Sequence, residues 1–139
     1  MGEQHQNNEK AVVASYFNGM GFDRWNRIYS ESDDVNKVQR NIRKGHQKTV
    51  DDVLNWISSS ENISRISFCD AGCGVGSLSI PLAKMGAKKI FASDISEAMV
   101  RETERRANDL NLDLSTFTFQ TSDLESIKGS YNTVICLDV

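Results

Sequence analysis

The sequence predicts an α/β fold in which helices cover a mostly parallel sheet, with an N-terminal helical cap before it. Two patterns lead to this prediction. Beyond residue 61, short apolar runs alternate with helical segments in the order strand, helix, strand, helix, strand, strand. Before residue 60, apolar residues instead recur at helical spacing. We therefore expect a cap or lid over residues 1–60 and a ligand-binding sheet domain over residues 61–139.

The N-terminal region carries one long amphipathic pattern. Between residues 35 and 57 the apolar residues follow one another at mostly helical spacing, which predicts a helix with one buried face. The polar residues 32–34 are candidates for its N-terminal cap, because such side chains accept hydrogen bonds from free backbone N–H groups. Gly45 and His46 interrupt the apolar stripe, so we expect a kink there, or a contact with a ligand or another helix.

The most clearly predicted helix of the sheet region runs from Ser96 to Leu110. Ser96 is its predicted cap, and apolar residues such as Met99 and Leu110 are expected to face inward. The charged residues between them, Glu102 included, are predicted to form a solvated outer face.

A glycine-rich turn follows the first apolar run of the sheet region. The run ends at Asp70, and the next residues, Ala-Gly-Cys-Gly-Val-Gly, end at Gly76. Glycines let the backbone turn sharply and approach a ligand closely. A dinucleotide site would want a glycine at position 77, where Ser77 stands, and a carboxylate before the turn repels phosphate and attracts cations. The motif thus favours S-adenosylmethionine (SAM), which carries an ammonium and a sulfonium group.

Acids also end the later apolar runs. Asp94 follows Gly76 by 18 residues, where a carboxylate at the tip of the neighbouring strand can accept both ribose hydroxyls of a nucleoside. Asp123 and Asp138 end the next two runs. Each acid alone is as readily explained as a helix cap, and glycine turns also occur in proteins that bind nothing. Their repetition at strand ends favours a binding rim.

These motifs together resemble those of class I S-adenosylmethionine-dependent methyltransferases, which have a Rossmann-like sheet. The resemblance implies a cofactor site formed by Asp70, Gly72, Gly74, Gly76, Asp94, Ile95, Asp123 and Leu124. In such a site the glycines pass close to the methionine part of SAM, and Asp70 orients its amino group directly or through water. Asp94 holds the ribose, and Asp123 contacts the adenine amino group. A metal site is not implied.

The N-terminal region resembles that of magnesium protoporphyrin IX methyltransferases. Residues 16–29, 35–40 and 42–46 carry this likeness, and the matching motifs run over nearly the whole chain. The resemblance implies transfer of the sulfonium methyl group to an oxygen of a porphyrin propionate, giving a methyl ester in chlorophyll biosynthesis, a part of photosynthesis. A carboxylate is already ionised at neutral pH, so the reaction needs alignment rather than a strong general base.

Tyr29 is our candidate catalytic residue, because a lid tyrosine could both cover the cofactor and donate a hydrogen bond. For the aromatic residues nearby, packing of the cap onto the sheet domain is the simpler explanation. A propionate could meet His46, Arg43 or Lys44, each of which is as readily a surface residue.

Two other functions stay open. A methyltransferase for another small-molecule acceptor, with a carboxylate, hydroxyl or amine, would share the cofactor residues and differ in the cap. A non-catalytic SAM-binding module could instead act as a sensor or an assembly partner. Turnover of magnesium protoporphyrin separates these functions, whereas cofactor binding does not.

The composition argues against several other classes. The chain has 139 residues and a formal net charge of −3, so it offers no nucleic-acid footprint. Its apolar stretches fall short of the roughly 20 residues that span a bilayer, and its start lacks signal or transit peptide character. We expect a cytoplasmic protein without a strong oligomer signal, in peripheral contact with photosynthetic membranes or other biosynthetic enzymes.

The three cysteines, Cys69, Cys73 and Cys136, lack the spacing of a metal site, so they are predicted to be buried thiols in a reducing compartment. The predicted sheet places its fourth strand beside the first and leaves an apolar edge open. We therefore expect the chain to be the N-terminal portion of a longer enzyme. The C-terminal strands and much of the acceptor pocket would be missing, and the chain would be inactive by itself.

Overall fold

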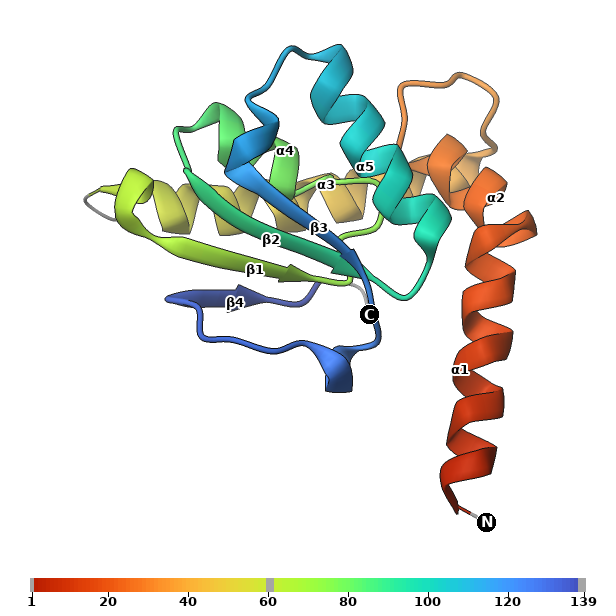
Figure 1. Ribbon diagram of the computed structural model, residues 1–139. Coiled ribbons are helices and arrows are strands. Elements are labelled where there is room, and N and C mark those ends of the chain that lie inside the picture. Colours follow the sequence, from red (N-terminus) through yellow and green to blue (C-terminus); the bar gives the residue numbers. More distant parts are fainter. Residues whose placement is uncertain (1, 60–61, 138–139) are drawn as a thin grey trace.

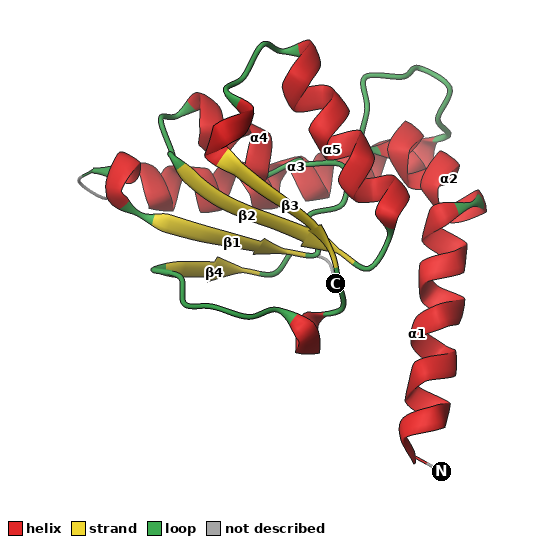
Figure 2. Cartoon of the chain, in the orientation of Figure 1, coloured by secondary structure: helices red, strands yellow, loops and turns green. Residues whose placement is uncertain are grey.

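The computed structural model describes residues 2–59 and 62–137. Within these ranges a four-stranded sheet packs against helices (Figures 1 and 2). The elements follow one another as α1 (Gly2–Asn18), α2 (Met20–Ile28), α3 (Lys37–Ser58), β1 (Ser67–Ala71), α4 (Ser79–Lys84), β2 (Lys89–Asp94), α5 (Glu97–Asp109), β3 (Phe117–Thr121) and β4 (Thr133–Ile135). Short 3₁₀ turns occupy residues 63–65, 114–116 and 124–126.

The sheet is parallel, with the strand order β3-β2-β1-β4. This arrangement confirms the predicted α/β fold and the placement of the fourth strand beside the first. Phe68 pairs with Ile90, and Ile90 pairs with Phe117, so these three side chains share one face of the sheet. Because the strands are parallel, the carboxyl ends of β1, β2 and β3 meet at one rim.

Helices α3, α4 and α5 cover this face. Val50 and Ile57 of α3, Leu82 of α4 and Ala107 of α5 pack in one cluster with Phe68. Helix α3 thus belongs to the core of the sheet domain as well as to the N-terminal region. The predicted boundary between residues 60 and 61 lies outside the described residues.

Helices α1 and α2 lie beside α5, and α1 extends away from the sheet (Figure 1). The side-chain oxygen of Asn18, the last residue of α1, accepts hydrogen bonds from Ser96 Oγ at 2.8 Å and from the Ala98 N–H at 3.0 Å. Ser96 itself caps α5, as predicted, by accepting from the Met99 N–H at 3.2 Å. The start of α5 and the end of α1 therefore stabilise each other.

The predicted cap of α3 at residues 32–34 is wrong. The cap is Asn36, whose side chain accepts from the Gln39 N–H at 2.8 Å, while the Gln39 side chain accepts from the Asn36 N–H at 3.2 Å. This reciprocal capping box satisfies two backbone donors at once, which favours a start at Lys37. The helix then continues without interruption past Gly45 and His46.

The predicted burial of Leu110 and Cys136 and the predicted exposure of Glu102 are also wrong. Leu110 is 48% exposed because it lies at the C-terminal cap of α5, beyond the face that packs on the sheet. Glu102 is only 7% exposed because two arginines neutralise it. Cys136 is exposed because it follows the edge strand β4, whereas Cys69 and Cys73 are buried as predicted.

Candidate functional site

The glycine turn connects the end of β1 to the start of α4. The backbone N–H groups of Gly72 and Cys73 both donate to the Ser93 carbonyl of β2, at 2.8 and 2.7 Å. Gly72, Gly74 and Gly76 all have positive φ angles, of 76°, 55° and 89°. Side chains rarely adopt this backbone conformation, so the turn requires glycine. It is held rigidly against β2 at the rim of the sheet.

Two of these glycines have different surroundings. A Cβ atom added at Gly74 would meet nothing within 4 Å, and Gly74 lines a cavity. A Cβ atom at Gly76 would lie 2.8 Å from Cγ2 of Thr103 and 3.0 Å from Cδ1 of Ile80. Gly74 thus leaves room for a ligand, whereas Gly76 lets the turn pack against α4 and α5 and does not line the cavity.

Asp94 ends β2 and faces the glycine turn. Its Oδ2 accepts from the Gly74 N–H at 3.0 Å, and its Oδ1 accepts from the Ser96 N–H at 2.9 Å. Burial raises the pKa of Asp94, and hydrogen bonds from the backbone N–H groups of Ser96, Gly74 and Ile95 oppose that shift. A carboxylate has about four acceptor positions, so Asp94 keeps acceptor capacity for a hydroxyl donor of a ligand. Asp94 and its neighbour Ile95 both line the cavity.

Asp70 lies within β1 and is only 3% exposed. Its Oδ2 accepts from the Ser79 hydroxyl at 2.6 Å, at the start of α4. Burial raises the pKa of Asp70 to about 6, against the opposing effect of the Ser79 hydrogen bonds. Asp70 does not line the cavity. Any influence on a ligand would therefore be electrostatic or pass through the turn.

Asp123 follows β3 and is paired with α1. Its Oδ1 accepts from the Ser126 N–H at 2.8 Å, and Lys10 Nζ lies 3.0 Å from Asp123 Oδ2 and 2.9 Å from Glu125 Oε2. The Ser126 hydrogen bond and then the Lys10 ammonium hold the pKa of Asp123 below its usual value. Asp123 and Leu124 line the cavity. The fourth predicted acid, Asp138, lies outside the described residues.

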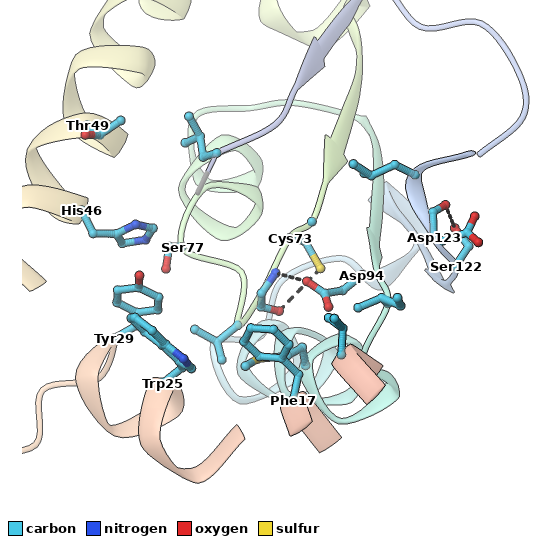
Figure 3. A pocket seen from close by; sticks show the side chains of 18 of the residues that line it. Phe17, Trp25, Tyr29, His46, Thr49, Cys73, Ser77, Asp94, Ser122 and Asp123 are labelled. Carbon is cyan, nitrogen blue, oxygen red and sulfur yellow. Dashed lines mark hydrogen bonds between the residues drawn. The ribbon is translucent and has the colours of Figure 1, made fainter. Parts of the chain in front are cut away.

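The opposite side of the cavity is formed by helical residues. Tyr29 stacks on His46 of α3, with ring centroids 4.0 Å apart and an interplanar angle of 22°. Trp25 lies 5.4 Å from the Tyr29 ring. In Figure 3 these three side chains lie across the cavity from Asp94 and Asp123. The apolar stripe of α3 is therefore interrupted at Gly45 and His46 where the helix contacts Tyr29, at the end of α2, and lines the cavity.

Arg43 is not directed at the cavity. Its guanidinium donates to the carbonyls of Ile28, Arg27 and Ser32 at 2.6, 3.0 and 2.9 Å. These bonds satisfy carbonyl groups at the C-terminal end of α2 and just beyond it. Its role in this structure is to hold α2 against α3, and of the three candidates for a propionate contact only His46 lines the cavity.

The cavity has a volume of about 710 Å³, within the range of small-molecule sites. Of the residues predicted for the cofactor site, all but Asp70 and Gly76 line it, and so does the candidate catalytic residue Tyr29. Several lining residues are not predicted from the sequence: Lys10, Val13, Ile42, Thr49, Met99, Ser122, Glu125 and Leu137. Ile42 and Thr49 could have been found, because they lie one helical turn to either side of His46. Lys10 gave no comparable signal.

Among residues 2–59 and 62–137, no group of three or more His, Cys, Asp or Glu side chains could hold a metal ion. None of the described helices is long and apolar enough to cross a membrane.

A family model described as "Methyltransferase domain" matches residues 68–139. Over 131 residues, 94% of this chain, the sequence is 52% identical to the magnesium-protoporphyrin O-methyltransferase of Synechocystis sp. and 50% identical to the chloroplastic magnesium protoporphyrin IX methyltransferase of Arabidopsis thaliana. The matches cover 56% and 42% of those proteins, so the chain spans about half the length of these curated relatives.

Two crystal structures of the Synechocystis PCC 6803 magnesium protoporphyrin IX methyltransferase are also similar. The structure with bound SAM aligns with a TM-score of 0.88, covering 94% of this chain and 62% of that chain at 52% identity. The structure with bound SAH aligns with a TM-score of 0.87, covering 94% of this chain and 58% of that chain. The similarity therefore includes the N-terminal helices as well as the sheet.

Proposed function

Because the chain belongs to the methyltransferase-domain family, we propose that it forms the SAM-binding site of an O-methyltransferase. The acceptor is a propionate carboxylate of magnesium protoporphyrin IX, and the reaction belongs to chlorophyll biosynthesis. One observation carries the proposal: residues of the glycine turn and of the N-terminal helices line the same cavity. The SAM motif alone would fit many methyltransferases, whereas the helical residues lie in the region that resembles the porphyrin enzymes.

The residues at the strand ends fit SAM. Gly74 leaves open space beside the turn, and the carboxylate of Asp94 is oriented by backbone N–H donors and keeps acceptor capacity. Asp94 would hold the ribose hydroxyls, and Ile95 and Leu124 would cover the adenosine. Asp123 reaches the same cavity but is paired with Lys10. Its contact with the adenine amino group would compete with that ion pair.

SAM, when bound, supplies the electrophilic methyl group. The acceptor carboxylate is ionised at neutral pH and needs no general base. The chain's own residues therefore act by binding and orientation, and positioning of this kind supplies several kcal/mol. Trp25, Tyr29 and His46 offer flat surfaces that would cover a porphyrin and exclude water. The Tyr29 hydroxyl could donate a hydrogen bond at the site of transfer.

The direct test uses the full-length protein with SAM and magnesium protoporphyrin IX. We expect a porphyrin that has gained one methyl group as an ester, detected by mass spectrometry. Activity confined to another carboxylate, hydroxyl or amine acceptor would reject the porphyrin assignment and retain the SAM site. SAM binding without turnover of any such acceptor would favour the sensor module instead.

The proposal includes a cytoplasmic location with peripheral contact to photosynthetic membranes. Its support is the apolar character of a porphyrin together with the exposed side chains of Val12 and Met20 on the N-terminal helices. Flotation of the full-length protein with lipid vesicles tests the contact, and a Val12→Ser, Met20→Ser variant is expected to bind less. Equal flotation of both proteins would reject it.

A further inference from the structure

The C-terminal end of α2 is held by arginines from two other helices. Arg43 of α3 donates to three carbonyl groups there, as described above. Arg106 of α5 also reaches this segment. Its Nη2 donates to Asn26 Oδ1 at 2.6 Å, and its Nη1 makes a longer contact of 3.4 Å with the Tyr29 carbonyl.

Arg106 is itself fixed by Glu102, one turn earlier on α5. The Arg106 Nε–H donates to Glu102 Oε1 at 3.0 Å, and the side chains of Glu102 and Arg106 are 8% and 22% exposed. A buried carboxylate with this geometry restrains its partner far more than a surface ion pair does. Arg105 also pairs with Glu102, at 2.8 Å from its Nε, but it turns toward Asp109 at 2.6 Å, so these two partners both lie on α5.

Helix α2 needs such attachments because few of its residues are buried. Of its nine residues only Gly21 and Ile28 are buried. Trp25 lies within this helix and Tyr29 caps its C-terminal end, and both line the cavity. The Asn26 side chain that Arg106 holds comes directly after Trp25, three residues before Tyr29. A change at Arg106 would therefore shift these two rings without touching the glycine turn or Asp94.

We propose that Arg106, anchored by Glu102, is a positioning residue that sets Trp25 and Tyr29 against the cavity. It acts through Asn26 and the end of α2 and touches neither reactant. The inference rests on the proposed methyl transfer for its kinetic consequence only. Its structural consequence, the restraint of α2, holds whatever the acceptor is.

The first experiment follows hydrogen–deuterium exchange of residues 20–30 in the full-length protein. Arg106→Gln is expected to raise exchange in this segment, and Arg105→Gln, which loses a bond to the same Glu102, is expected to leave it unchanged. Asn26→Ala removes the contact from the α2 side and keeps the Glu102 pair, so it should resemble Arg106→Gln. Unchanged exchange in both Arg106→Gln and Asn26→Ala would overturn the inference.

The second experiment separates positioning from general loss of structure. Arg106→Gln is expected to lower kcat for methyl transfer about tenfold, since misplacement near 1 Å is enough for such losses. SAM affinity should stay within about twofold, and Arg106→Lys should recover part of kcat. Equal losses in kcat and SAM affinity, or a kcat no lower than that of Arg105→Gln, would overturn the inference. If the wild type methylates no acceptor, the proposed function fails, and exchange alone decides whether Arg106 restrains α2.

Discussion

The two sides of the cavity are built by different means. The strand-end wall, residues 72–75 with Asp94 and Ile95, is held by backbone hydrogen bonds and by the register of parallel strands. The helical wall, formed by Trp25, Tyr29 and His46, is held by ring stacking and by arginine side chains that reach across from α3 and α5. One wall is therefore determined mainly by the main chain and the other mainly by side chains.

This difference separates the expected effects of mutation. Changes in the strand-end wall alter groups that would touch SAM, so they should reduce affinity. Changes in the helical wall alter groups that would orient the acceptor, so they should reduce turnover and leave affinity nearly intact. The following predictions test that separation.

The largest effect is expected from Gly74→Val. The residue has a positive φ of 55°, and its side chain would project into open space in the cavity, so SAM binding should be abolished. Gly86→Val is the matched control, because Gly86 also has a positive φ and open surroundings but does not line the cavity. Both variants should lose stability, and only Gly74→Val should lose SAM binding in calorimetric titration. If the folded Gly74→Val protein still bound SAM, the assignment of Gly74 to the SAM site would be rejected.

Asp70 of β1 and Glu102 of α5, which do not line the cavity, should respond to pH in opposite directions. The pKa of Asp70 is raised to about 6 by burial, so the folded state binds the extra proton and stability falls as pH rises from about 4 to 6. The wild type should lose up to about 3 kcal/mol of its free energy of unfolding between pH 4 and 7 through this group, and Asp70→Asn should not show that loss. Urea unfolding at several pH values measures the difference. A pH-independent difference between the two proteins would contradict the prediction.

Glu102 provides the opposite case. Hydrogen bonds from Arg105 and then Arg106, against the effect of burial, hold the pKa of Glu102 below its usual value. Its stabilisation is therefore present above the unfolded pKa and is lost as pH falls through the folded value. Glu102→Gln should thus be most destabilising near neutral pH and least so in acid.

Asp94→Ala is expected to weaken SAM binding at least tenfold, about 1.4 kcal/mol, because charge-assisted bonds to two hydroxyls would be lost. Asp113→Ala is the control, since Asp113 also accepts from a backbone N–H, that of Ser115, but lies outside the cavity. Equal SAM affinity in the wild type and a folded Asp94→Ala protein would reject the ribose assignment.

The smallest effect is expected from Tyr29→Phe. Loss of one neutral hydrogen bond near the site of transfer should lower kcat about three- to tenfold and leave SAM affinity within about twofold. Tyr131→Phe serves as the control, because the Tyr131 hydroxyl donates to the Lys128 carbonyl away from the cavity. A fall in affinity that matches the fall in kcat would show that the two walls do not act separately.

Predictions from the sequence succeeded best at the strand-end wall. Apolar runs ending in acids indicated the parallel strands, and the glycine turn indicated a close approach of the backbone. The helical wall was harder to predict. Glu102 was assigned to the solvated face because the pattern of α5 cannot reveal an arginine pair that neutralises it. The interruption of the apolar stripe at His46 predicts a kink or a contact, and the structure adds that it is a contact, a stack on Tyr29.

The sequence by itself determined the α/β fold, the place of the fourth strand beside β1 and the location of the strand-end rim, because strand period, glycine φ angles and strand-end acids are local properties of the chain. Only the tertiary structure decided which groups share the cavity, how the charged groups are paired and which pKa values are shifted. It pairs Lys10 with Asp123, raises the pKa of Asp70, and brings Arg106 to Asn26. These contacts join residues far apart in the chain, and they depend on how α1, α2 and α5 pack at the rim.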